Sequence, residues 1–244
     1  AMRELGVPFA GLFGACSTMA EGLALGAALC EGGAARNLLA MASSHFCAAE
    51  RQFRTPLSYG AVRTPTAQWT ATAAGCCLLQ PQGEGVGIAA ATFGRVQDYQ
   101  VKDINNMGAA MAPAAASTLL HYFKDTGTEP QEFDCIYTGD LGQVGSQLLR
   151  EQLAAEGLLI KNHVDCGCIL FDANEQSVKS GGSGPGCCAA VLCGHILPRL
   201  RRGSQKRVLF TATGALMSQT TFLQKETIPA VAHLVELRAP EKEK

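Results

Sequence analysis

Cys16 is the residue of this sequence best placed to do chemistry. It lies in the motif Gly-Ala-Cys-Ser-Thr at 14–18, between an apolar run at 7–13 and a segment of small and apolar residues at 19–30. The run predicts a buried strand, and the segment predicts a helix buried on all sides. Cys16 would then begin that helix, where free N–H groups and the helix dipole favour a thiolate. The alternative is that Cys16 has no chemical role and is only a small buried residue, as free cysteines often are.

A similar unit occurs later in the chain. The segment 37–43 reads as a second strand, so the first unit would be a right-handed strand–helix–strand crossover. A second apolar helix pattern begins at Cys187 and is followed by a predicted strand at 207–213. Alignment of the two units places Cys187 on Cys16. The pattern therefore predicts an internal duplication with a cysteine at the start of each helix.

The elements that must position these cysteines alternate along the rest of the chain. We predict further strands at 70–79, 87–96, 133–138, 169–172 and 230–237, and helices at 114–124 and 144–155. The first two of these strands would form an antiparallel edge of the first half. The Gly-, Asn- and Met-rich segment 102–113 reads as a connector, so we expect one half at 1–105 and another at 106–244. The expected fold class is α/β.

Three polar residues lie near predicted strand ends. Asp140 follows the strand at 133–138, and His163 and Asp165 precede the strand at 169–172. Loops at the carboxyl ends of strands hold ligands in open α/β folds, so these loops would converge on Cys16 if the halves stack. A carboxylate beside Cys16 would raise the thiol pKa and could not donate to an oxyanion. Asp140 is equally consistent with a cap of the next helix.

A long loop after the second strand carries several arginines, among them Arg51, Arg54 and Arg63. Long loops inside compact domains often cover a site, so these side chains could form a cationic wall for an anionic ligand. The alternative is ion pairing with carboxylates such as Glu50 at the surface.

Composition limits the class of protein. The chain has 244 residues, 47% of them hydrophobic, which is enough for a large core. The net charge is −1 and only 17% of residues are charged, so no basic stripe is available for nucleic acid. The eleven cysteines lie mostly in apolar runs and include adjacent pairs. This spacing favours a reducing compartment over a disulfide framework or a zinc site.

The beginning of the chain predicts neither a signal peptide nor a membrane span. The apolar stretch 9–30 is interrupted by Glu21 and by several glycines, which favours a buried helix over a transmembrane segment. Residues 2–6 resemble the end of a helix. We therefore expect a fragment that lacks the start of its first half.

A set of longer motifs is spread over nearly the whole chain. These motifs are Gly14-Ala-Cys-Ser-Thr18, Ser43-Ser-His-Phe-Cys47, Glu50-Arg-Gln-Phe-Arg54, Pro65-Thr-Ala-Gln-Trp69, the segment 102–113, Thr138-Gly-Asp-Leu-Gly142 and Gly181-Gly-Ser-Gly184. Together they resemble the stage V sporulation protein AD family, which is similar to thiolases. The resemblance implies a thiolase-like fold of two similar halves, with mixed sheets and buried central helices.

The resemblance also implies two candidate functions. Thiolase-like condensing enzymes use a cysteine nucleophile with two partners, either His and Asn or two His. This chain has Asp140 where the first partner is expected, and His163 and Asp165 near the second, so a cysteine-dependent acyltransferase is the less favoured function. The favoured one is a non-catalytic sporulation protein that binds dipicolinic acid and helps its uptake into the developing spore.

A site for this flat aromatic dianion would combine helix N-termini, a cation and an apolar wall. The residues expected to contribute are Cys16, His45, Asp140, His163, Asp165 and Cys187, with Arg51 and Arg54 as anion-binding residues. No resident cofactor or protein-held metal is expected, although the carboxylates would suit calcium bound through dipicolinate.

The same resemblance implies partners and a location. The expected partners are membrane proteins of stage V sporulation, with a homodimer as a further option and no nucleic acid. The expected location is inside the sporulating cell, at the periphery of the spore inner membrane.

Overall fold

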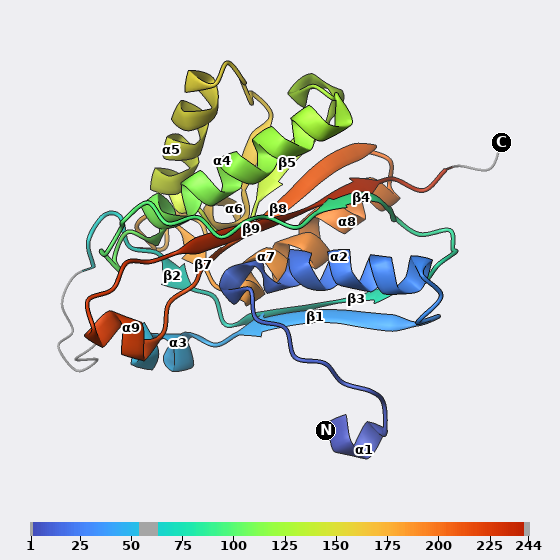
Figure 1. Ribbon diagram of the computed structural model, residues 1–244, viewed down its shortest axis with the longest axis horizontal. Coiled ribbons are helices and arrows are strands. Elements are labelled where there is room, and N and C mark those ends of the chain that lie inside the picture. The colour runs from blue at the N-terminus through green and yellow to red at the C-terminus, as the bar shows by residue number, and fades with distance from the viewer. Residues whose placement is uncertain (1, 54–62, 242–244) are drawn as a thin grey trace.

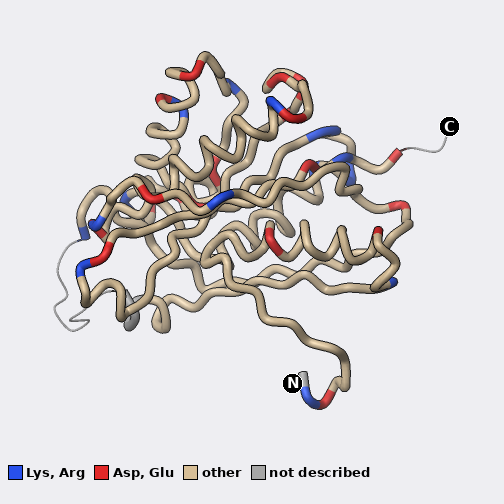
Figure 2. Tube along the Cα trace, in the orientation of Figure 1, with Lys and Arg blue, Asp and Glu red and all other residues tan. Residues whose placement is uncertain are grey.

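Stacked layers of helices and sheets make up the protein (Figure 1). The computed structural model describes residues 2–53 and 63–241. Helices α4 (Met107–Thr126) and α5 (Gly142–Ala155) cover one face of a five-stranded sheet. Helices α2 (Thr18–Glu31) and α7 (Pro185–Val191) lie on its other face, and a two-stranded sheet packs beyond them. Along the described chain, charged residues lie mostly in loops and at helix ends (Figure 2).

The central sheet is mixed and has the strand order β4-β9-β8-β5-β6. Its strands are β4 (Gly87–Thr92), β5 (Cys135–Thr138), β6 (His163–Asp165), β8 (Arg207–Ala215) and β9 (Ala230–Arg238). Strands β8, β5 and β6 run parallel, whereas β9 is antiparallel to both β8 and β4. β5 and almost all of β8 and β9 are buried, as expected for strands covered by helices on both faces.

Smaller elements complete the layers. β1 (Leu38–Ser44) pairs antiparallel with β3 (Ala73–Leu79), and β2 (Trp69–Thr70) pairs parallel with β7 (Gly182–Ser183). The remaining α-helices are α1 (Met2–Leu5), α3 (Phe46–Phe53), α6 (Cys166–Leu170), α8 (Leu197–Arg201) and α9 (Gln219–Leu223). Short 3₁₀ turns lie at Ala15–Ser17 and Pro130–Glu132, and a π turn lies at Leu192–Ile196.

The central sheet separates two hydrophobic cores. Leu119 of α4 and Leu149 of α5 pack on one face, and both are fully buried. Met19 of α2, Leu192 and Phe210 of β8 belong to the core on the other face, where the cysteine-bearing helices lie. Each such side chain contributes about 1.5–3 kcal/mol when fully buried, so the helices that carry the site are firmly held.

Helix α4 begins earlier than the sequence suggests. Asn106 caps it by accepting a hydrogen bond from the backbone N–H of Ala109, and Gly127 ends it in the left-handed conformation with φ 63°. The prediction of a connector over 102–113 is therefore wrong from Met107 onward. Pro113 lies inside the helix, and the small residues around it pack as part of the core.

Two expectations for the first 30 residues are wrong. The run 7–13 forms no strand, and Phe9 and Phe13 are 68% and 76% exposed. Helix α2 is buried on one face only, because Leu25 and Leu29 are exposed. Apolar composition predicts burial, but a strand also needs a neighbouring strand for its ladder, and none of the described strands pairs with this run. The crossover predicted for the first unit is consequently absent from the described residues.

Two strand predictions also need correction. The segments 70–79 and 87–96 are not partners, because β3 pairs with β1 whereas β4 pairs with β9 in the central sheet. The segment 169–172 is not a strand. Helix α6 forms over Cys166–Leu170, because the Asp165 side chain caps it by accepting from the Gly167 N–H at 3.0 Å. The boundary between halves at 105/106 stays a prediction.

A buried ion-pair network fastens α4 to the central sheet. Glu236 of β9 is 2% exposed, and its carboxylate accepts hydrogen bonds from Arg207 at 2.8 Å, from Arg238 at 2.6 Å and from the Tyr122 hydroxyl of α4. Burial opposes ionisation of Glu236, but these donors outweigh it and lower the carboxyl pKa to about 2.

We predict that Glu236→Gln destabilises the protein by about 2–3 kcal/mol at pH 7. An unfolded glutamate has a pKa of about 4.3, so ionised Glu236 stabilises the fold above that pH, and this contribution is lost as pH falls toward 2. Urea unfolding from pH 7 to pH 3 should show the gap between wild type and variant narrowing below about pH 4. The exposed Glu84→Gln is the control, and a gap that stays constant with pH would contradict the prediction.

Candidate functional site

A cavity of about 510 Å³ opens where the turn before α2, the end of β1, helix α3 and the start of α7 meet. Its wall is largely apolar and includes Leu12, Phe13, Met41, Met107 and Met217. Polar groups line it at a few places, namely Cys16, Thr18, Ser43, Ser44, His45, Gln68, Thr70, Asn105 and Ser183. An apolar hollow with a few convergent polar groups is typical of a small-molecule site.

A strained turn presents Cys16 to this cavity. The preceding residue, Ala15, has φ 49°, a left-handed conformation that is costly for a residue with a side chain. The Ser17 hydroxyl donates to the Gly14 carbonyl at 2.6 Å and so closes the turn. Gly214 of β8 lies against the turn, and a Cβ there would collide with the Gly14 carbonyl. The central sheet therefore fixes the position of Cys16.

Asp140 is fully buried behind Cys16 at the end of β5. Its carboxylate accepts hydrogen bonds from the Ser183 hydroxyl at 2.9 Å, the Gly184 N–H at 3.0 Å and the Thr213 hydroxyl at 3.0 Å. The Cys16 thiol is a further hydrogen-bond partner of the same carboxyl group. Burial raises the pKa of Asp140 although these donors favour the ionised form.

The environment of Cys16 favours the thiol over the thiolate. Desolvation raises its pKa well above the ordinary value, and the Asp140 carboxyl raises it further through charge and hydrogen bonding. The expected thiolate at the helix N-terminus is therefore wrong, because burial and a neighbouring carboxyl outweigh the helix dipole. The structure brings Asp140 together with Cys16. As the sequence suggests, the carboxyl group raises the pKa of the thiol.

His163 and Asp165 lie outside the cavity lining and hold the surrounding backbone. Asp165 accepts from the Thr138 hydroxyl at 2.6 Å and from the N–H groups of Leu141 and Gly142 at 2.9 Å. Burial raises the Asp165 pKa to about 7, partly offset by these bonds. His163 lies 2.9 Å from the Thr138 hydroxyl, and burial followed by the Arg150 charge lowers its pKa to about 4. Both residues position the loop that carries Asp140.

The other residues singled out in the sequence lie in different places. His45 lines the cavity and is exposed. Cys187 is fully buried beside Gly182 and is not part of the lining. Arg51 lies in α3, but its side chain is outside the described residues, as is all of Arg54. The proposed cationic wall therefore stays a prediction.

Sequence reasoning did not place Ser183 in the candidate site. It lines the cavity and donates to Asp140. Gln68 was also missed, although its amide nitrogen donates to the carbonyls of Asp140 and Gly182, the latter at 3.0 Å. The Gly181-Gly-Ser-Gly184 motif was the available signal, because glycines around a single hydroxyl permit close approach of backbone to a site. Gly184 has φ 100°, which favours glycine.

Metal ligands and membrane spans were sought in the described part of the chain. Residues 2–53 and 63–241 contain no group of three His, Cys, Asp or Glu side chains arranged to hold a metal ion. Among the same residues, every helix is too short or too polar to cross a bilayer.

Solved structures define the class of this fold. The 3-oxoacyl-[acyl-carrier-protein] synthase III from Aquifex aeolicus VF5 superposes with a TM-score of 0.58 at 14% identity, covering 97% of this chain and 69% of the synthase. The tetronic acid condensing enzyme AbyA1 gives a TM-score of 0.59 at 16% identity, covering 96% of this chain and 69% of that enzyme. The protein therefore has the thiolase-like α/β fold, as predicted, with mixed sheets around central helices.

Sequence comparison is more specific than the fold. The family model for stage V sporulation protein AD matches residues 1–238. Stage V sporulation protein AD of Bacillus subtilis (strain 168) is 44% identical over 232 residues, which cover 95% of this chain and 68% of that protein. This chain belongs to the stage V sporulation protein AD family.

We predict that Asp140→Asn makes Cys16 more reactive. The substitution removes the Asp140 charge that helps to raise the thiol pKa, so alkylation at pH 8 should be about tenfold faster. Iodoacetamide labelling followed by peptide mass spectrometry measures the rate at Cys16. The exposed Asp172→Asn is the matched control and should leave the rate unchanged. An unchanged rate in Asp140→Asn would show that Asp140 does not control the thiol.

Proposed function

We propose that this protein is a non-catalytic member of the thiolase-like class that binds dipicolinic acid in the Cys16 cavity. The observation that carries the proposal is that burial, together with the neighbouring Asp140 carboxyl, raises the pKa of the Cys16 thiol beside an open cavity of about 510 Å³. Such a site has the volume to bind a small molecule but lacks an activated nucleophile.

The polar groups around Cys16 also argue against acyl transfer. An acyl-transfer site needs hydrogen-bond donors aimed at the developing oxyanion. Here the Ser183 hydroxyl and the Gly184 N–H donate to Asp140 instead. Loss of one oxyanion donor alone lowers rates by about 10²–10³, so this arrangement disfavours catalysis.

The cavity suits a flat ring that carries acidic groups. Met41, Met107 and Met217 offer polarisable apolar contacts for the ring faces. His45 is the only Lys, Arg or His side chain among the described lining residues, and it supplies a donor at the rim. A dianion facing so little positive charge would be costly to desolvate. The calcium chelate of dipicolinate carries less charge, so we propose that it is the preferred form.

The proposed role extends to uptake of dipicolinate into the developing spore together with stage V sporulation membrane proteins. Family membership supports this role, and the protein would act at the periphery of the spore inner membrane, inside the sporulating cell. A homodimer is compatible with the proposal. The experiments below test ligand binding, which is the step that the cavity would perform.

We predict saturable binding of dipicolinate by calorimetric titration, with tighter binding when calcium is present. Isophthalate is the control ligand, because it has the same shape but lacks the ring nitrogen that completes the calcium chelate. His45→Ala should weaken binding about tenfold through loss of a hydrogen-bond donor. His121→Ala, at an exposed position of α4, should leave affinity unchanged. Absence of heat with millimolar dipicolinate, with and without calcium, would contradict the proposal.

A cysteine-dependent acyltransferase is the second candidate. The strained Ala15, with φ 49°, directs Cys16 toward an apolar cavity, and such strain is often found at active sites. We predict that incubation with acyl-CoA leaves Cys16 unmodified in intact-mass and peptide mass spectrometry. An acyl adduct that disappears in Cys16→Ser would favour the enzyme over the binding protein.

A further inference from the structure

Two thiols outside the cavity face each other across the outer layers. Cys77 of β3 and Cys193 of the π turn at Leu192–Ile196 lie with their Sγ atoms 3.9 Å apart. Both residues are partly exposed, so small reagents can reach them. They are separated by 116 positions in the sequence, and only the packing of the helix on the β1–β3 sheet brings them together.

The backbone explains why these thiols meet. Side chains alternate along β3, so Cys77 faces inward whereas Cys76 is exposed. Helix α7 approaches β3 closely at Gly75, where a Cβ would collide with the Ala189 backbone. This approach brings the following helical turn, which contains Cys193, over Cys77.

The π turn follows from the sequence after α7. The N–H of Leu197 bonds to the carbonyl of Leu192, five residues earlier, and the next residue, Pro198, has no N–H to continue the ladder. The chain passes through this one wide turn and continues as α8.

The pair combines a reactive thiolate with a resolving thiol. The hydrogen bond from Cys77, with smaller contributions from the Cys76 backbone and the Arg201 charge, outweighs burial and lowers the pKa of Cys193 to about 6. The same hydrogen bond raises the pKa of Cys77. A thiolate that is open to solvent and lies beside a second thiol is the usual arrangement of a redox-active cysteine pair.

We propose that Cys77 and Cys193 form a reversible disulfide when the protein meets a small-molecule disulfide such as oxidised glutathione. The Cys193 thiolate attacks one sulfur of the oxidant, forms a mixed disulfide and releases one thiolate. Cys77 then loses its proton and attacks the Cys193 sulfur, which releases the second thiolate. Two protein thiols are oxidised, one molecule of oxidant is reduced to two thiols, and an excess of reduced thiol reverses both steps.

This disulfide would join two segments that adjoin elements of the cavity wall. β3 pairs with β1, whose last residues Ser43 and Ser44 line the cavity, and the π turn follows α7, whose start at Gly184 and Pro185 lines it as well. Oxidation would therefore fasten the outer sheet to the turn after α7 without altering Cys16. The disulfide proposal does not depend on dipicolinate binding. It depends only on the thiol chemistry of Cys77 and Cys193.

The test equilibrates the native protein with oxidised glutathione, blocks the remaining thiols with iodoacetamide and maps peptides by mass spectrometry. We expect a linked peptide pair joining Cys77 to Cys193, which dithiothreitol removes. We also expect a higher melting temperature after oxidation, because the link constrains the unfolded chain. Cys76→Ser is the matched control and should retain the link, whereas Cys77→Ser should stop at the glutathione adduct on Cys193.

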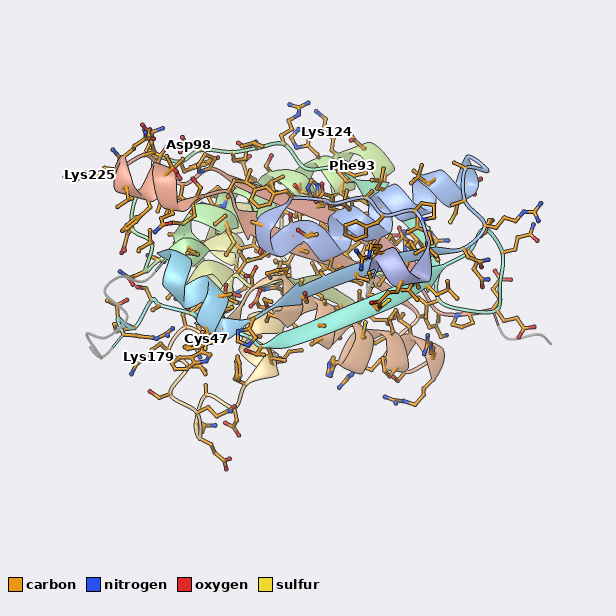
Figure 3. All side chains as sticks on the ribbon, turned by 90° about the horizontal axis from the view of Figure 1, so that it is seen from below. Cys47, Phe93, Asp98, Lys124, Lys179 and Lys225 are labelled. Carbon is orange, nitrogen blue, oxygen red and sulfur yellow. The ribbon has the colours of Figure 1, made fainter. Side chains whose placement is uncertain are left out.

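The alkylation rate of Cys193 tests the proposal separately from disulfide formation. At pH 5.5 Cys193 should react with iodoacetamide about tenfold faster than an ordinary exposed thiol, given its larger thiolate fraction and lower intrinsic nucleophilicity. Cys47 of α3, which is exposed and labelled in Figure 3, is the internal reference. Absence of the linked pair, or a link from Cys76 to Cys193 instead, would overturn the proposal. Equal reactivity of Cys193 and Cys47 would overturn the activated role of Cys193.

Discussion

The buried carboxyl of Asp140 is the interaction on which the site depends. It accepts hydrogen bonds from Ser183, from the Gly184 backbone and from Thr213, and so joins the ends of strands β5, β7 and β8. A buried carboxyl without these donors would be too costly to desolvate. The same bonds place the carboxyl behind Cys16, where it adds to the effect of burial and raises the pKa of the thiol. The Asp140 side chain therefore both joins these strands and influences the chemistry of Cys16.

Under the proposed function, this coupling explains how a fold similar to that of condensing enzymes could serve binding. The strained turn, the helix start and the apolar cavity around Cys16 are all present. The Ser183 hydroxyl and the Gly184 N–H, two hydrogen-bond donors near this cavity, are engaged by Asp140. The proposed function therefore relies on reversible occupancy of the cavity and not on covalent chemistry. The fold alone does not distinguish these functions, because function resides in the site.

The local patterns predicted many elements but not their partners. The predicted helix at 19–30 and the predicted strands at 207–213 and 230–237 correspond to α2, β8 and β9. The run 7–13 failed as a strand because strand formation depends on a neighbour that composition does not reveal. The sequence pattern could not predict that β4 pairs with β9 instead of β3, for the same reason. Asp165 converted an expected strand into helix α6 through a single side-chain cap.

The sequence by itself determined the thiolase-like class, the family and the place of Cys16 at the start of a helix, because these reside in contiguous motifs. Only the tertiary structure decided which polar residues meet. It put Asp140 and Ser183 beside Cys16, and it assigned His163 and Asp165 to holding backbone. It also brought Cys77 and Cys193 within 3.9 Å. The physical reason is that pKa values and side-chain contacts follow from burial and from neighbours distant in sequence.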